Sequence, residues 1–136
     1  MALNQAFNAD TLSHLRKAVL KVATEVGMTS ARAADVVLTV HELAANAVRY
    51  GGGGGEVRLS TDPEGLHCQV TDTGPGDVDG HASPGDDEPW PLIPGHGLWI
   101  VHKVADCVSV VRSRGRSRVT AVFALPGLGL LSIVSY

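Results

Sequence analysis

Three polar side chains stand at helical spacing within residues 41–50. Glu42 and Asn46 are four residues apart, and Arg49 follows three residues later. Because residues three or four apart share one face of an α-helix, these side chains form a polar stripe. A carboxylate can accept a proton from a hydroxyl or a water, and a carboxamide oxygen suits Mg²⁺. The alternative is that the stripe is only the solvent-facing side of an amphipathic helix.

A second group of candidates follows the end of an expected strand. Asp72 is followed by Gly74 and Gly76, and these two glycines force a tight backbone path. Glycine also lets a ligand approach the backbone where a side chain would collide. A turn without a ligand explains the same residues, because aspartate and glycine are common turn formers.

A third group begins a short apolar helix expected at residues 98–105. Gly95, His96 and Gly97 directly precede Leu98. The unpaired N–H groups and the positive dipole end of such a helix start suit a phosphate. His96 is a candidate phosphate contact, and an exposed histidine without a role is the alternative.

Hydrophobic periodicity predicts the elements that position these residues. Two helices are expected at residues 11–26 and 30–50, and two hairpins at residues 57–70 and 107–125, with the short helix between the hairpins. This order predicts an α+β fold, a two-layer α/β sandwich in which a mostly antiparallel sheet has helices on one face. The five glycines at 51–55 are expected to form a flexible connector without regular structure.

The 136-residue length predicts a single domain. We place it at residues 1–125, with an irregular lid at 77–94 and an apolar tail of unassigned role at 126–136. Hydrophobic residues make up 44% and charged residues 18% of the chain, which excludes a disordered protein. The amino terminus lacks the features of a secretion signal, and no apolar run is long enough to span a bilayer.

Net charge and cysteine usage indicate which partners and which redox state to expect. The net charge is −3, and the arginines at every second position from Arg112 to Arg118 are expected to form one solvated hairpin face, so direct nucleic-acid binding is not expected. Cys68 and Cys107 lie in apolar runs and are expected to be reduced core residues of a cytoplasmic protein.

The order and spacing of the three candidate groups resemble the GHKL ATPase superfamily, which includes gyrase and the histidine kinases. The resemblance covers residues 30–125 and implies the Bergerat, histidine kinase-like ATPase fold with ATP and Mg²⁺ as cofactors. The short length looks like the bacterial anti-sigma factor serine kinases of the SpoIIAB and RsbW type. Such a protein binds a sigma factor in one state and phosphorylates a serine of a STAS-domain anti-anti-sigma protein in the other. Members often pair, which leaves a homodimer open.

The resemblance also implies roles for individual residues. Glu42 matches the catalytic base, Asn46 matches the Mg²⁺ ligand, and Asp72 matches the acceptor of a hydrogen bond from the adenine amino group. The other matching positions are assigned to cofactor binding: Arg49, Gly74, Gly76, Gly95, His96, Gly97, Leu98 and Thr120. Thr120, on the last strand, is expected on the adenine side of the pocket.

One departure from the family pattern leaves a second function open. Residues 73–102 contain no lysine or arginine, so the lid offers no cation to a transferring phosphoryl group. The first hypothesis is a serine/threonine protein kinase of the anti-sigma type. The second is a regulatory binding module that uses nucleotide occupancy to set partner affinity, with little or no phosphoryl transfer. A detached histidine-kinase catalytic domain is a third reading, which would need a phospho-accepting histidine on another chain.

Overall fold

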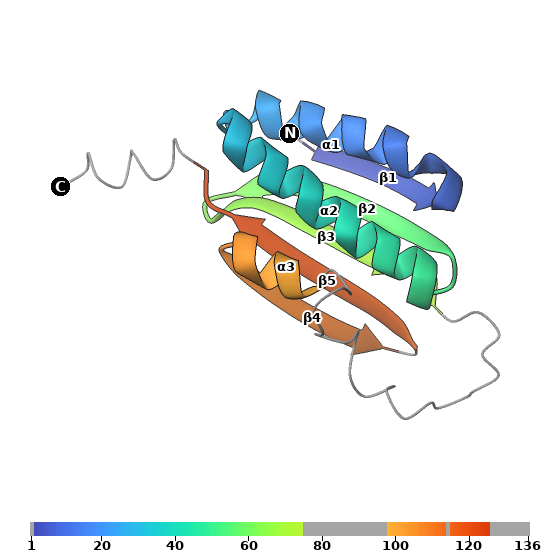
Figure 1. Ribbon diagram of the computed structural model, residues 1–136. Helices are drawn as coiled ribbons and strands as arrows, with labels where there is room; N and C mark the ends of the chain where they lie inside the picture. Colours follow the sequence, from blue (N-terminus) through green and yellow to red (C-terminus); the bar gives the residue numbers. More distant parts are fainter. Residues whose placement is uncertain (1, 75–97, 114, 126–136) are drawn as a thin grey trace.

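The computed structural model describes residues 2–74, 98–113 and 115–125, and it contains all the helices and strands expected from the sequence, with two further short elements at the amino terminus (Figure 1). In chain order they are β1 (Ala2–Asn8), the 3₁₀ helix η1 (Ala9–Thr11), α1 (Leu12–Glu25), α2 (Ser30–Tyr50), β2 (Gly54–Asp62), β3 (Gly65–Asp72), α3 (Leu98–Val104), β4 (Cys107–Ser113) and β5 (Arg116–Phe123). None of the helices in these ranges is long and apolar enough to cross a membrane.

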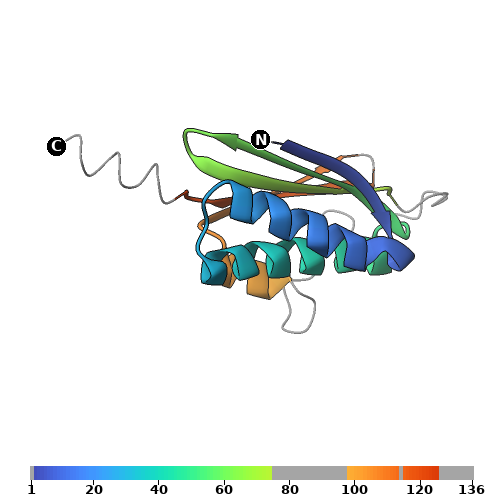
Figure 2. The ribbon, with the colours of Figure 1, turned by 90° about the horizontal axis from the view of Figure 1, so that it is seen from above.

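The described strands form one sheet in the order β1-β2-β3-β5-β4, and each neighbouring pair is antiparallel. Figure 2 shows that α1, α2 and α3 all lie on the same face of this sheet. The core fills the space between the two layers and includes residues from both. The expected α+β sandwich, with helices on one face of an antiparallel sheet, is confirmed.

Local sequence explains where α2 begins and which side it buries. Thr29 is its N-cap, and the side-chain oxygen accepts a hydrogen bond from the backbone N–H of Arg32 at 3.2 Å. Gly27, with φ at 97°, makes the turn from α1. Buried apolar residues then recur at three-and-four spacing along α2 and face the sheet: Ala33, Val36, Val40, Leu43 and Ala47.

The glycine run differs from the sequence expectation. Gly54 and Gly55 belong to β2, where they pair with Asn8 of β1 and Asp72 of β3. A Cβ on Gly54 would lie 2.4 Å from the carbonyl oxygen of Phe7, so side chains are excluded by the neighbouring backbone. The run is therefore not simply a flexible connector, because close packing between two strands needs glycine there.

The amino-terminal strand β1 was not expected from the sequence. It pairs with β2 along its whole length, from Ala2 opposite Ser60 to Asn8 opposite Gly54. Asn8 then caps η1, because its side chain accepts a hydrogen bond from the N–H of Asp10 at 2.8 Å. Thr11, one of the two expected cap residues, is the N-cap of α1, although its side chain makes no capping hydrogen bond there.

Two expectations about the second hairpin are wrong, and both errors concern which face a side chain takes. Val108 and Val110 of β4 pack against the core, so Cys107 lies on the other face and is exposed. Arg112 shares the face of the two valines, whereas Arg116 and Arg118 alternate with the buried Ser117 and point away from the helices. The arginines thus do not form one solvated face.

Candidate functional site

The polar stripe of α2 is longer than the sequence indicated. Arg32, Asp35 and Thr39 precede Glu42, Asn46 and Arg49 at the same three-and-four spacing, so the six residues follow one side of the helix. This side is next to α3, because the guanidinium of Arg32 donates a hydrogen bond to the carbonyl oxygen of Val104 at 2.7 Å. The stripe therefore lies on the side of α2 that faces α3, the helix that follows Gly95 and Gly97.

Asn46 is the most unusual member of this stripe. Its side chain is 1% exposed, and Nδ2 has no hydrogen-bond partner among the described residues. Thr39, two turns earlier, is fully buried and its Oγ1 also lacks a described partner. A buried polar group without a partner costs about 1–3 kcal/mol, so each such group calls for an explanation, such as a catalytic role or a bound water or ion. Glu42, between them, is half-buried, and Arg49 is exposed beside Tyr50.

Asp72 ends β3 on the same side of the sheet as α2. Its side chain is 2% exposed, and Oδ1 accepts hydrogen bonds from the N–H groups of Gly74 and Ser117, each at 3.0 Å. The bond to Gly74 closes an Asx turn, and Gly74 itself has φ at 87°. Two backbone donors therefore fix the orientation of the carboxylate.

The end of α2 is packed directly onto Asp72. A Cβ on Gly51, the C-cap of α2, would lie 2.5 Å from Oδ2 of Asp72. A Cβ on Gly52 would lie 1.8 Å from the carbonyl oxygen of Gly74. The absence of side chains at both glycines brings the helix bearing Asn46 against the turn bearing Asp72.

Burial dominates the electrostatics of Asp72. Desolvation raises the pKa of its carboxyl group above the ordinary value of 3.8, while the hydrogen bonds from Ser117 and Gly74 and the charges of Arg112 and Arg116 act in the opposite direction. Arg116 also donates from Nε to the backbone carbonyl of Asp72 at 3.2 Å. The carboxylate is thus buried but supported, as expected of a group that has to accept a hydrogen bond from a ligand.

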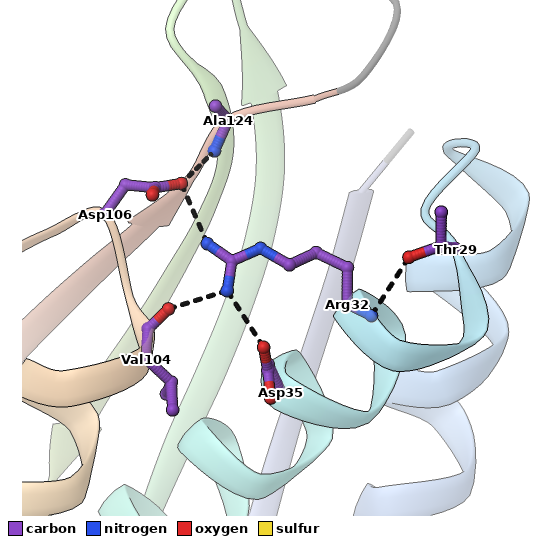
Figure 3. A network of polar contacts seen from close by, with 6 residues as sticks. All are labelled: Thr29, Arg32, Asp35, Val104, Asp106 and Ala124. Carbon is purple, nitrogen blue, oxygen red and sulfur yellow. Dashed lines mark hydrogen bonds and ion pairs between the residues drawn. The ribbon is translucent and has the colours of Figure 1, made fainter.

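A network around Arg32 fixes the far end of α3 (Figure 3). The guanidinium pairs with Asp35 at 2.9 Å and with Asp106 at 3.0 Å, in addition to its bond to Val104. Asp106 in turn accepts a hydrogen bond from the N–H of Ala124 at 2.8 Å. The network joins α2, the end of α3 and the end of β5, and so sets where α3 lies along the polar stripe.

The structure places Glu42 and Asn46 on α2 and the buried Asp72 at the end of β3, with Gly74 in the turn that follows. Leu98 begins α3. Thr120 lies elsewhere: it pairs with Gln69 and alternates with the buried Val119 and Ala121, so it points away from the helices. This placement does not suit the expected adenine-side role. Several predicted positions lie outside the described residues, and their placement stays a prediction: Gly76, Gly95, His96, Gly97, the lid at 77–94 and the tail at 126–136.

Two residues near Asp72 were missed in the sequence. Ser117 is fully buried and donates its N–H to the carboxylate. Arg112 reaches the same region, because its Nη1 lies 3.3 Å from the Ser117 hydroxyl. Val119, Ala121 and Phe123 alternate along β5, and Ser117 lies on the same face as these three residues. The alternation in the sequence could therefore have identified Ser117 as an inward-facing residue.

Comparison with known proteins agrees with this geometry. The family model described as histidine kinase-like ATPase domain matches residues 6–123, which includes both the polar stripe of α2 and Asp72. No curated protein matches the chain.

Proposed function

The chain belongs to the histidine kinase-like ATPase domain family, and from this premise we propose that it is an ATP-dependent serine/threonine protein kinase of the anti-sigma factor type. Membership of this family supports ATP binding in general. The serine specificity and the partners rest on the resemblance to the anti-sigma factor kinases.

One observation carries the proposal: a buried carboxylate and a buried carboxamide lie at the same end of α2, joined through Gly51. The Asp72 carboxylate is held by two N–H donors on Oδ1, and Oδ2 faces the side-chain-free Gly51. An ionised carboxylate only accepts hydrogen bonds. It therefore selects the amino group of adenine over the carbonyl oxygen of guanine.

The carboxamide of Asn46 fits the metal that accompanies the nucleotide. Its Nδ2 is buried without a described partner, and rotation of the amide by half a turn would place the oxygen at that position. Mg²⁺ prefers oxygen ligands and keeps several waters, so one carboxamide oxygen with phosphate oxygens suffices. When bound, Mg·ATP supplies the phosphoryl group and the cation that offsets its charge.

Glu42 is the residue assigned to proton transfer. It lies one helical turn before Asn46 on the same stripe and is half-buried. From there its carboxylate can accept the proton of a serine hydroxyl near the metal. Arg49, one turn beyond Asn46, is the cation of the stripe nearest the end of α2 and is assigned to phosphate contact.

The partners proposed from the resemblance are a sigma factor and a STAS-domain anti-anti-sigma protein. In this scheme the protein binds the sigma factor in one state and phosphorylates a serine of the STAS protein in the other. Pairing of two copies is part of the same resemblance.

A second candidate function is a nucleotide-gated binding module with little or no phosphoryl transfer. The absence of lysine and arginine from residues 73–102 favours it, because a transferring phosphoryl group is usually stabilised by a nearby cation. Arg112 does not remove this objection, since it lies beside Asp72 at the end proposed for adenine.

Incubation with γ-labelled ATP and a panel of STAS-domain proteins separates the two candidates. The kinase leaves label on a serine, and Glu42→Gln abolishes the label while ATP binding, measured by calorimetry, is retained. Glu25→Gln is the matched control, because Glu25 is an exposed carboxylate on α1. Tight ATP binding with no labelled protein in the panel would favour the binding module. No preference for ATP over GTP would contradict both.

A further inference from the structure

A polar groove lies on the face of the sheet that points away from the helices. Its volume is about 340 Å³, and its lining comes from β2, β3 and β5: Glu56, Arg58, Gln69, Thr71, Arg116 and Arg118. On β2 these residues alternate with the buried Val57 and Leu59, which face the helices. Figure 2 shows no described helix over this side of the sheet.

Strand register brings the arginines together over β3. Arg58 pairs with Gln69, and Arg118 pairs with Thr71 two residues further along the same strand. Cross-strand neighbours on one face have Cβ atoms about 4.5–5.5 Å apart. The two guanidinium groups therefore reach over β3 from its two sides, on a face of the sheet separate from Asp72 and Asn46.

The groove holds unused positive charge. Three guanidinium groups face one carboxylate, that of Glu56. Within residues 2–74, 98–113 and 115–125, no ion pair or side-chain hydrogen bond engages Arg58 or Arg118. Arg116 differs, because its Nε already donates to the carbonyl oxygen of Asp72. The groups available to a ligand are thus Arg58 and Arg118, with Gln69 and Thr71 as hydrogen-bonding partners between them.

We propose that this groove is a docking surface for an acidic peptide segment of a partner protein. A guanidinium binds a carboxylate through two parallel hydrogen bonds, and two unengaged guanidinium groups can take two acidic side chains of one extended segment. Glu56 argues against a nucleic acid, since a continuous phosphate backbone would meet its charge. A peptide can instead place a neutral or basic residue there.

Fluorescence anisotropy with a labelled octaglutamate peptide at low salt tests the proposal without nucleotide, so its outcome is independent of the proposed kinase activity. Wild-type protein is expected to bind, and the double variant Arg58→Gln/Arg118→Gln is expected to lose at least about tenfold in affinity, equivalent to 1.4 kcal/mol. Lys17→Gln/Lys21→Gln is the matched control: it makes the same charge change at two exposed residues of α1 and is expected to bind like wild type.

Three results would overturn the proposal. The first is no octaglutamate binding by the wild-type protein. The second is an equal loss in the Lys17 and Lys21 control, which would mean that only net charge matters. The third is a single-stranded oligonucleotide that binds through Arg58 and Arg118 more tightly than the peptide. Far-ultraviolet circular dichroism and thermal unfolding of both double variants establish that each is folded.

Discussion

The carboxylate of Asp72 packs against Gly51, so that a Cβ at Gly51 would lie 2.5 Å from Oδ2. Gly51 is the residue at which α2 ends, and Asp72 is the residue at which β3 ends. The contact therefore joins the helix that carries Asn46 to the turn that carries the carboxylate proposed to select adenine. The helix end and the carboxylate can come this close only because Gly51 has no side chain.

The first prediction is that Gly51→Ala pushes the end of α2, which carries Asn46, away from the turn that carries Asp72. The φ of Gly51 is −118°, which alanine can adopt, so the damage comes from overlap with Asp72. Such overpacking costs about 1–3 kcal/mol, and we expect weaker ATP binding together with a lower melting temperature. Calorimetry and thermal unfolding measure the two effects.

Gly53→Ala is the control for this prediction. Gly53 has φ at 96° but no atom within 4 Å of an added Cβ. Alanine there should cost stability through backbone strain alone, about 1–2 kcal/mol, with ATP affinity unchanged. Equal losses of ATP affinity in both variants would refute the specific role of the Gly51 contact.

The second prediction concerns pH and Asp72. Desolvation raises the pKa of this carboxyl group above 3.8, so the folded state binds a proton more tightly than the unfolded state. The contribution of Asp72 to the free energy of unfolding is then largest below pH 3.8 and is lost as the pH rises through the folded-state pKa. Urea unfolding across this range should show Asp72→Asn gaining stability relative to wild type as the pH increases. A constant difference would contradict the raised pKa.

How far the sequence could predict the fold depends on how local each signal was. The periodicity of α2 and the alternation along β2 and β3 are properties of single segments, and all three elements were expected. The strand β1 was missed because its seven residues are defined by pairing with β2, which no local pattern reveals. Gly54 and Gly55 were misread for the same reason, since only the neighbouring strands show why glycine is needed.

The candidate site residues could be predicted where helical spacing determines which face a side chain takes. The prediction failed where the alternation along a strand determines the face. Glu42 and Asn46 share a helix face by spacing, and Asp72 is positioned by the end of its strand. Thr120 was expected near adenine, yet its alternation with Val119 puts it on the other face. The same parity identifies Ser117, whose N–H meets Asp72.

The third prediction is that only one of the two thiols reacts in the folded protein. Cys107 is exposed and Cys68 is fully buried, and burial raises the pKa of the Cys68 thiol to about 12. Because the thiolate is the reactive form, a disulfide reagent at pH 8 should label one thiol natively and two in guanidinium chloride. Cys107→Ser should leave no native reaction, and Cys68→Ser should leave it unchanged. Two thiols reacting at once in native wild type would contradict the placement.

The fourth prediction is that Arg32→Met loosens α3. The variant keeps an apolar stem near Phe123 but removes the contacts with Asp35, Val104 and Asp106. Because the guanidinium is partly exposed, we expect a loss of only about 1–2 kcal/mol. Amide hydrogen exchange should become faster in α3 and at the end of β5.

Arg16→Met serves as the control for Arg32. Arg16 is an exposed residue of α1 whose guanidinium contacts His41 at 3.2 Å. Its loss should leave exchange in α3 unchanged. If both variants changed α3 equally, or neither did, the network would not be what holds this helix.

The fifth prediction separates function from stability at Asn46. Asn46→Leu removes a buried amide whose Nδ2 has no described partner, so the protein without nucleotide should keep its stability or gain up to about 1–3 kcal/mol. Binding of ATP should nevertheless lose its dependence on Mg²⁺, because the proposed oxygen ligand is gone. Thr39→Val removes the other unpartnered group of the stripe and should stabilise without affecting Mg²⁺ dependence. A destabilised Asn46→Leu protein with normal Mg²⁺ dependence would show that the amide is structural, since a metal ligand gives the opposite pair of results.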